Sequence, residues 1–439
     1  MKTLPKREVP GPKSRELLEL SRIYEPPCAA DQVPVVWDHA DRVWVTDVDG
    51  NRYIDFTSGV LVTNVGHAHP GLVQAIQKQA SRLMNCYSFP TPERVTAAAR
   101  LVKTFPPNLD KVFFLSTGSE ATEAAMRVAR RSTGKQEILA FYGAFHGRTY
   151  GAMGVSGILG IRRQFGVPVP GGIMVPYAYC YRCFYDRTYP ECDFFCLKTL
   201  DRIIGSSSSD DLGAVIVEPY QGTAGFVFPP DGWLTELAKW ARARNLLLIV
   251  DEVQSSFGRT GMMYAIEWED IRPQMLCLGK GLGSGVACSA LAGESKVFEC
   301  MSPGELSSTW GGNPVSSAAA LAVLDAMEKE KLAENALKIG EVLKARFLEM
   351  KKKYRCLGDV RGRGLVMGLE LVDPKDGWTP SPELTGRFIH SCAENGLLLG
   401  KVGVYGNVVR IAPPLVIRQE EAEMALDIIE SELKNLQGG

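Results

Sequence analysis

The chain has 439 residues, of which 45% are hydrophobic and 23% are charged, as in a globular protein with room for two domains. Lysine and arginine number 49 against 50 aspartates and glutamates, so the net charge of -1 gives no global attraction to nucleic acid or to an anionic membrane. A small molecule is therefore the expected partner.

The sequence also indicates a soluble protein of a reducing compartment. No stretch approaches the ~20 apolar residues that a membrane span requires, and the basic N-terminal residues are not followed by the apolar core of a signal peptide. Eleven cysteines, an odd number, are scattered from Cys28 to Cys392, which suits reduced thiols better than a disulfide framework. We therefore predict a cytoplasmic location.

The first predicted element is a hairpin within residues 44–56 (WVTDVDGNRYIDF), where Asp49-Gly50 or Gly50-Asn51 supplies the turn. Four short apolar runs follow, and they are typical of strands that helices cover on both faces. These runs are Lys111–Leu115, Ala214–Val217, Leu246–Val250 and Met275–Leu278. Because such runs alternate with segments of helical period, we predict an α/β fold with a mostly parallel sheet.

The character of the sequence changes near residue 327. A long charged helix is predicted there, and strand-like runs follow at residues 364–372 and 407–416. We predict a smaller α+β domain over residues 327–439, with the N-terminal segment 1–62 packing against it. Residues 63–326 then form the large domain.

Polar or reactive side chains follow each of the four predicted strands. They are residues 116–119 (STGS), Glu218, Asp251 and Lys280. Ligands of open α/β sheets bind outside the carboxyl ends of the strands, so these residues form the candidate site. A phosphate seat at a helix start, a carboxylate and an amine are together what one phosphorylated pyridine aldehyde needs.

Each residue also has a simpler interpretation. Lys280 could be a loop lysine whose amine reaches water, Asp251 a helix N-cap, and residues 116–119 an ordinary capping turn. Their joint occurrence favours an enzyme in which Lys280 forms an imine with the aldehyde and Asp251 keeps the ring nitrogen protonated. Gln254 would then reach the ring oxygen. The glycines around Lys280 fit neither a Walker loop nor a dinucleotide fingerprint.

Six motifs occur in the order and spacing of the class III aminotransferases: STGSEA, FHGRT, VEPYQG, VDEVQSSFGRTG, LGKGLGSG and STWGGNP. The chain resembles this family, which includes 4-aminobutyrate, ornithine and acetylornithine aminotransferases, over nearly its whole length. The resemblance implies fold type I of the pyridoxal-phosphate enzymes, with pyridoxal 5'-phosphate held at Lys280 as a Schiff base. It also implies a homodimer with shared active sites, or a tetramer of such dimers.

The implied reaction is the ping-pong transfer of an amino group from an amino acid or ω-amine donor to a 2-oxo acid. A racemase or epimerase of the same fold is the alternative, because some members of the family invert amino-acid α-carbons. Both activities need Lys280, Asp251 and a group that binds the substrate carboxylate.

The resemblance also implies roles for individual residues. Lys280 and Asp251 are the implied catalytic residues. The implied cofactor-binding residues are Gly118, Ser119, Phe145, His146, Glu218, Asp251, Val253, Gln254, Lys280 and Thr309. Of these, Phe145 and Val253 resemble the residues on the two faces of the ring, and Thr309 resembles the residue that reaches the phosphate from the neighbouring subunit.

The implied substrate-binding residues are Val60, Arg148 and Arg410, of which Arg410 grips a carboxylate. One position departs from the family pattern. Thr223 stands where 4-aminobutyrate and ornithine enzymes usually carry a glutamate that pairs with the arginine matching Arg410. Because a threonine cannot neutralise that arginine, we expect a substrate whose carboxylate stays on Arg410, or an enzyme that moves Arg410 away.

Four cysteines form the pattern CxxC-x8-CxxxC inside an aromatic segment: Cys180, Cys183, Cys192 and Cys196. Four thiolates could hold zinc, although the second spacing is loose for a zinc knuckle. The alternative is a set of free cysteines that order a loop near the site entrance. We assign no metal ligand from the sequence.

Overall fold

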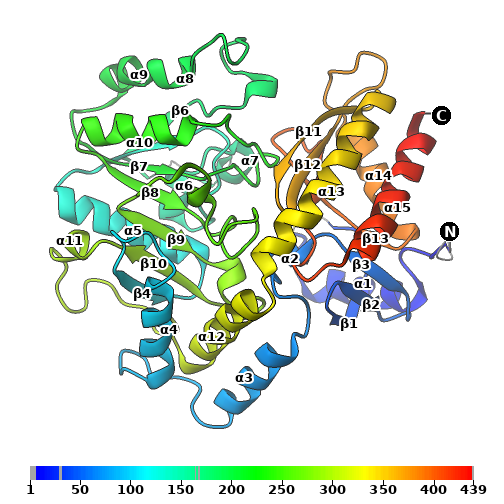
Figure 1. The fold of residues 1–439 in the computed structure, drawn as a ribbon, viewed down its shortest axis with the longest axis horizontal. Helices are drawn as coiled ribbons and strands as arrows, with labels where there is room; N and C mark the ends of the chain where they lie inside the picture. The colour runs from blue at the N-terminus through cyan, green and yellow to red at the C-terminus, as the bar shows by residue number, and fades with distance from the viewer. Residues whose placement is uncertain (1–5, 29–31, 164, 167–168, 438–439) are drawn as a thin grey trace. The chain divides into compact units, whose positions relative to one another are not determined.

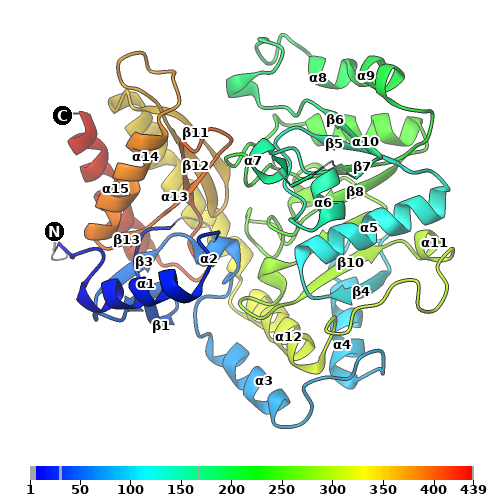
Figure 2. The same ribbon diagram turned by 180° about the vertical axis from the view of Figure 1, so that it is seen from behind.

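The computed structural model describes residues 6–28, 32–163, 165–166 and 169–437. Its backbone divides into two compact units. The first unit combines Met1–Pro70, Arg259–Gly261 and Lys331–Gly439, and the second combines Gly71–Gly258 and Met262–Glu330. Figures 1 and 2 show the chain from opposite sides.

A seven-stranded sheet forms the centre of the second unit, in the order β4-β10-β9-β8-β7-β5-β6. The strands from β9 to β6 are parallel, and β10 runs antiparallel between β4 and β9. All residues of β7, β9 and β10 are buried, as expected for strands covered on both faces. The bounds are β4 (Lys111–Leu115), β5 (Glu137–Phe141), β6 (Gly172–Val175), β7 (Leu212–Val217), β8 (Leu247–Asp251), β9 (Met275–Leu278) and β10 (Ser289–Gly293).

Helix α5 (Gly118–Thr133) packs on this sheet through an alanine-rich face. Thr117 and Glu120 form a capping box at its start, and Gly134 ends it in the left-handed conformation. Helix α5 lies in front of the sheet in Figure 2, and α10 (Trp233–Ala243) lies in front of it in Figure 1. Both faces of the sheet are therefore covered. The buried residues of α5 include Ala121, Ala124, Ala125, Val128 and Ala129, which share one face of the helix.

The remaining elements of the second unit are helices and turns around the sheet. None of the helices in the described part of the chain combines the length and the apolar character that a bilayer crossing needs. The elements are α3 (Pro70–Ala80), α4 (Pro92–Val102), α6 (Tyr150–Gly154), α7 (Leu159–Arg162), η1 (Cys180–Arg182), α8 (Phe195–Lys198), α9 (Leu200–Ser207), η2 (Ala265–Glu269), η3 (Lys280–Leu282), α11 (Ser295–Phe298) and α12 (Pro314–Lys329).

Two four-stranded sheets build the first unit, in the orders β1-β2-β3-β13 and β11-β12-β15-β14. Strand β13 pairs in parallel with β3, so the N-terminal and C-terminal segments share one sheet. The strands are β1 (Trp37–Asp41), β2 (Trp44–Asp47), β3 (Arg52–Asp55), β11 (Leu357–Arg363), β12 (Val366–Leu371), β13 (Leu397–Leu398), β14 (Gly400–Val402) and β15 (Val408–Ile411). The helices are α1 (Pro12–Tyr24), α2 (Ser58–Leu61), α13 (Leu332–Lys353), α14 (Pro382–Glu394) and α15 (Gln419–Gln437).

The predicted α/β fold with a mostly parallel sheet is confirmed. The four predicted strands all form, but β7 already begins at Leu212, and β8 includes Asp251 as its last residue. The predicted hairpin is the β2–β3 pair, with Gly50 at a φ of 86° in its turn. Strand β10 was not predicted, because its sequence SALAG is made of small residues with little strand propensity.

Candidate active site

The carboxyl ends of the central strands carry the acidic and basic residues of the candidate site. Glu218 follows β7, Asp251 is the last residue of β8, and Lys280 begins η3 shortly after β9. These three strands are neighbours and parallel, so the three residues start from one edge of the sheet. Gly118 lies at the same edge, because β4 and β9 run in the same direction on either side of β10.

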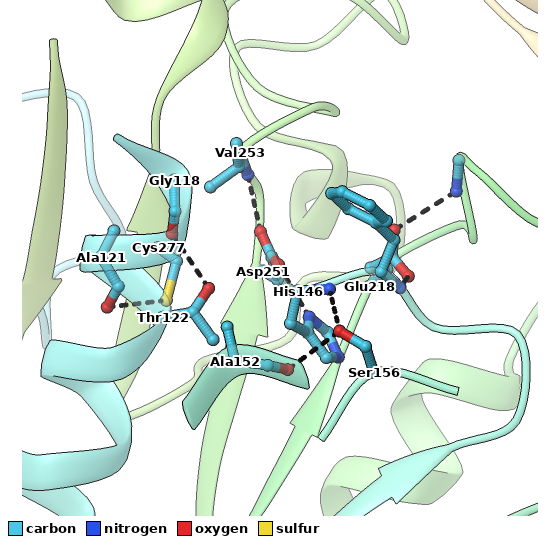
Figure 3. A network of polar contacts seen from close by, with 12 residues as sticks. Gly118, Ala121, Thr122, His146, Ala152, Ser156, Glu218, Asp251, Val253 and Cys277 are labelled. Carbon is cyan, nitrogen blue, oxygen red and sulfur yellow. Dashed lines mark hydrogen bonds and ion pairs between the residues drawn. The ribbon is translucent and has the colours of Figure 1, made fainter. Parts of the chain in front are cut away.

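Asp251 is held by two hydrogen bonds in a nearly dry environment. The Nδ1–H group of His146 donates to Oδ2 of Asp251 at 2.7 Å, and the N–H group of Val253 donates to Oδ1 at 3.0 Å (Figure 3). Asp251 is 5% exposed and His146 is 2% exposed. The backbone N–H of His146 donates in turn to the hydroxyl of Ser156 at 3.0 Å. These contacts fix the direction in which the carboxylate points.

Burial and charge set the protonation of the groups around Asp251. Burial alone would lower the pKa of His146, but the hydrogen bond to Asp251 and its charge raise that pKa above the usual value. Burial raises the pKa of Glu218 to about 7, with the charge of His146 opposing this change and that of Asp251 adding to it.

Glu218 links two loops at the end of the sheet. Its Oε2 accepts the N–H of Phe145 at 2.9 Å, and its Oε1 accepts the N–H of Gly222 at 3.3 Å. Figure 3 shows Glu218 beside His146 and Asp251. The segment that carries Phe145 and His146 is thus attached to the segment that follows β7.

The first turn of α5 provides a seat for an anion. A helix leaves its first N–H groups without intrahelical acceptors, and its dipole places positive charge there. Glu120 accepts the N–H groups of Ser116 and Thr117, which leaves the first-turn groups of Gly118 and Ser119 at the open end of the helix. A Cβ atom at position 118 would lie 2.8 Å from Cγ1 of Val253, so only glycine lets the backbone approach this closely.

Val253 also packs against the segment that carries Lys280. A Cβ atom at Gly279 would lie 3.1 Å from the same Cγ1 atom of Val253. Lys280 itself has a φ of 41°, a left-handed conformation that is uncommon for a residue with a side chain. Such strained positions cluster at functional sites.

Several buried polar atoms of this region have no hydrogen-bond partner among the residues that the structure describes. They include Oγ of Ser116, Nε2 of His146 and Oε1 of Gln254. The side chain of Gln254 lies against Gly222, where an added Cβ atom would be 1.9 Å from Oε1. Unpaired buried polar atoms are costly in a finished core, but they suit a site that receives a polar ligand. The amine, the carboxylate, the glycine cradle and the free amide oxygen together fit pyridoxal 5'-phosphate.

Arg410 belongs to the first unit, on β15. It is 4% exposed, and its Nε–H has no hydrogen-bond partner in the described residues. Burial lowers the pKa of Arg410 to about 10, while the charge of Asp55 opposes that change. The guanidinium lies over Gly400, the residue opposite it on β14, where a Cβ atom would be 2.3 Å from Nη2. A buried cation with an unpaired donor is suited to binding a carboxylate.

The structure places the other predicted residues as follows. Arg148 lies over the ring of Phe145, with its Cζ 6.0 Å from the ring centroid, and its N–H donates to the hydroxyl of Ser119. Thr309 is exposed in the second unit. Val60 is 42% exposed in the first unit and has a φ of 76°. The structure therefore brings the predicted cofactor residues into one unit, whereas Val60 and Arg410 belong to the other.

Comparison with known proteins identifies the family of the chain. The family model for class III aminotransferases matches residues 27–433. An alanine/serine racemase of Pyrococcus horikoshii is 37% identical over 97% of this chain and 91% of its own, and an acetylornithine aminotransferase of Methanopyrus kandleri is 39% identical over 90% and 92%. A solved (S)-enantioselective omega-transaminase of Thermomicrobium roseum is 29% identical, with a TM-score of 0.89 over 96% of this chain and 98% of that chain.

A mostly parallel sheet with a lysine, a buried carboxylate and a helix start at its carboxyl edge is the arrangement that a pyridoxal-phosphate enzyme needs. The chain belongs to the class III aminotransferase family, whose members use pyridoxal 5'-phosphate. The predicted family and cofactor are thereby confirmed. The relatives include both aminotransferases and racemases, so they define the class of enzyme and leave the reaction to be decided.

Three supporting residues were not found from the sequence. Ser156 anchors the backbone of His146, Gly222 carries the side chain of Gln254, and Gly400 lies beneath Arg410. Gly222 and Gly400 leave room for a neighbouring side chain because they have none of their own. Ser156 binds the backbone of His146, which lies ten residues earlier in the chain. Of the three, Gly222 alone had a signal in the sequence, because it is the glycine of the motif VEPYQG, which already indicated the site.

Proposed function

We propose that the protein is an aminotransferase that moves an amino group from an amino acid or ω-amine donor to a 2-oxo acid, in a ping-pong reaction that uses Lys280. The observation that carries this proposal is the arrangement of Lys280, Asp251 and the α5 N-terminus at one edge of the sheet. When bound, pyridoxal 5'-phosphate supplies an electron-withdrawing ring that stabilises negative charge on the substrate carbon.

The residues of the chain then have distinct tasks. The Nζ atom of Lys280 would hold the cofactor aldehyde, and the same amine, once free, would carry the proton to and from the substrate carbon. Asp251 would supply the negative charge that keeps the pyridine ring protonated, and His146 and the Val253 N–H keep that carboxylate in position. Gly118 and Ser119 would bind the phosphate through backbone N–H groups.

Arg410 supports a substrate with a carboxylate near the reacting carbon. Its guanidinium is buried, and its Nε–H has no partner among the described residues. Thr223 carries no charge that could neutralise this arginine when a substrate without that carboxylate binds. We therefore propose that α-amino acids are better donors than simple ω-amines.

A racemase or epimerase is the second candidate, and the 37% identity to an alanine/serine racemase supports it. Transamination needs one acid–base residue, which Lys280 supplies. Inversion of an α-carbon needs proton delivery to both faces of that carbon. The presence of Lys280 and Asp251 is common to both reactions, so the test must follow the product.

The holoenzyme should be incubated with one enantiopure amino acid, once alone and once with pyruvate or 2-oxoglutarate. An aminotransferase consumes the donor only when the oxo acid is present and forms the matching new amino acid. Chiral chromatography of the donor measures its inversion. If the donor is inverted catalytically without any oxo acid, the protein is a racemase and the proposed aminotransferase activity is wrong. The Lys280→Ala variant, which lacks the reacting amine, serves as the control in both arms.

We also propose that the protein is a homodimer with shared active sites. In the second unit, Met84, Phe89, Val95 and Trp310 are large apolar side chains with more than half of their surface exposed. The hydroxyl of Tyr87 lies 3.3 Å from that of Ser307, so the segment that contains Phe89 approaches the segment that precedes Thr309. Exposed large apolar side chains are typical of a protein interface when they lie together.

A further inference from the structure

Arg410 carries its positive charge in a dry environment without a direct ionic partner. It is 4% exposed, and it forms no ion pair within the part of the chain that the structure describes. An isolated buried cation is costly, because the protein interior screens charge far less than water does. A negative charge elsewhere in the first unit must therefore offset that cost while the site holds no carboxylate.

Asp55, the last residue of β3, is a fully buried carboxylate of the same unit. Its Oδ1 accepts the N–H and the hydroxyl of Thr57, each at 2.7 Å, and its Oδ2 accepts the Nε2–H of His67 at 2.8 Å. His67 is itself fixed, since its backbone N–H donates to the carbonyl oxygen of Arg42 at 2.8 Å and its ring packs edge-on against Trp37. These donors hold the Asp55 carboxylate in one direction.

The backbone after Asp55 joins the two strands that position Arg410. The N–H of Phe56 donates to the carbonyl oxygen of Leu398 at 2.9 Å, and the carbonyl oxygen of Phe56 accepts the N–H of Ala412 at 2.8 Å. Leu398 lies just before the glycine beneath the guanidinium, and Ala412 lies just after Arg410 on β15. The electrostatics agree, because burial lowers the pKa of Arg410 and the charge of Asp55 opposes that change.

We propose that Asp55 is the fixed counter-charge of Arg410 and thereby determines how strongly the enzyme prefers substrates with a carboxylate. Its charge lets the guanidinium stay buried when a substrate brings no carboxylate, a task for which Thr223 offers no charge. Because Thr57 and His67 keep Asp55 from a direct ion pair, the N–H donors of Arg410 stay available to the substrate. Asp55 is a positioning residue that acts through Arg410. The inference rests on the proposed role of Arg410 in binding a carboxylate, and it holds for either reaction.

The test compares ligands that differ only in the carboxylate: L-alanine with ethylamine, and L-phenylalanine with 2-phenylethylamine. Titration of the holoenzyme, followed by the absorbance of the bound cofactor, gives a dissociation constant for each ligand. Asp55→Asn removes the charge but keeps an acceptor for Thr57 and a donor for His67. The amines should then bind roughly tenfold more weakly, since they leave Arg410 without a neighbouring negative charge. The amino acids, which bring their own carboxylate, should lose no affinity.

Asp47→Asn is the matched control. Asp47 is 2% exposed, ends the neighbouring strand β2, and accepts the hydroxyl of Tyr53 at 2.9 Å and the N–H of Asn51 at 2.7 Å. This variant should leave the ratio of amine to amino-acid dissociation constants unchanged. In an Arg410→Ala background, Asp55→Asn should no longer change that ratio, because the effect of Asp55 passes through Arg410.

Equal weakening of both ligand classes in Asp55→Asn would show that Asp55 supports only the fold, and would overturn the inference. If that variant does not fold, Thr57→Ala decides. It frees one carboxylate oxygen to turn toward Arg410, so the amino acids should bind more weakly while the amines do not, and equal or absent effects would refute the role of Asp55. Unchanged amino-acid binding in Arg410→Ala would instead show that the proposed carboxylate site itself is wrong.

Discussion

Asp251 combines a negative charge with a fixed direction in a dry environment. Its two oxygens accept from His146 and Val253, so the carboxylate cannot turn away from the edge of the sheet. We predict that Asp251→Asn keeps the cofactor bound but lowers kcat by orders of magnitude, because the amide no longer stabilises the protonated ring. Steady-state kinetics together with the cofactor absorbance band measure both parts of this prediction.

Glu252 offers a matched control for this substitution. It is the next residue, is buried like Asp251, and undergoes the same exchange of a carboxyl group for an amide in Glu252→Gln. Its carboxylate accepts the hydroxyl of Ser255 and the N–H of Ile266, and it is not part of the proposed cofactor site. If the two variants slow the reaction equally, the effect arises from the loss of any buried carboxyl group in this turn, and Asp251 has no special role.

Gly400 is predicted to control the binding of carboxylate substrates through Arg410. In Gly400→Ala the new methyl group would lie 2.3 Å from Nη2 of Arg410, so the guanidinium must move. Charged hydrogen bonds contribute roughly 1.5–3 kcal/mol, so we expect KM for α-amino acids to rise roughly tenfold to a hundredfold. KM for a simple amine should change little. Gly386→Ala, at a helical glycine with open space around it, is the control.

A uniform rise of KM for acids and amines would show that Gly400 acts on the fold rather than on Arg410. Arg410→Ala should reproduce the selective loss and exceed it, because the cation itself is removed. Burial lowers the pKa of Arg410 to about 10, so the guanidinium stays charged at neutral pH. Because pH 8 is still roughly two units below that pKa, the selective rise of KM should not depend on pH between 6 and 8.

At the scale of the elements, the turn after β8 is a source of pH-dependent stability. Burial raises the pKa of Glu252 from 4.5 to about 7, despite hydrogen bonds from Ser255 and Ile266. The folded protein therefore binds a proton that the unfolded chain has already lost in this range. The stabilising contribution is complete below pH 4.5 and is lost as the pH rises through 7, which corresponds to roughly 3 kcal/mol.

We predict that Glu252→Gln removes this part of the pH dependence. The free energy of unfolding of the variant should fall less steeply between pH 4.5 and 7 than that of wild type, and the variant should be the more stable of the two at pH 8. Denaturant unfolding at a series of pH values measures the difference, with Glu267→Gln as the less buried comparison. Identical slopes for wild type and Glu252→Gln would contradict the assignment.

The elements also show why some features could be predicted from the sequence and others could not. Lys280 and Asp251 could be predicted as site residues because each follows a run of apolar residues that a covered strand explains. Strand β10 was not predicted because its small residues fit the close packing between β4 and β9. That packing is a property of the folded sheet and leaves no pattern in the sequence. The role of Ser156 was not predicted because its contact with His146 depends on the conformation of a loop, and loops have no periodic sequence pattern.

At the scale of the whole molecule, the sequence predicted the parallel sheet, the site at its carboxyl edge and the family. It left the cysteines undecided, because the spacing CxxC-x8-CxxxC does not show whether the loop between the pairs closes. A cavity that all four cysteines line answers that question in three dimensions. The loop brings the two pairs of cysteines together through aromatic packing between residues far apart in the chain, which a local sequence pattern cannot show.

The exposed apolar side chains of the second unit lead to the last prediction, which concerns assembly. Phe89 is 76% exposed and Trp310 is 65% exposed, and burial of such side chains favours association by roughly 1.5–3 kcal/mol each. Phe89→Glu would place a charge in that interface, so the variant should have the mass of one chain in light scattering where wild type has the mass of two. Because Thr309 is proposed to reach the partner's phosphate, the variant should also bind the cofactor more weakly. Leu348→Glu, on an exposed position of α13, controls for the added charge and should leave both properties unchanged. A wild-type protein that is monomeric while fully active would rule out the shared site.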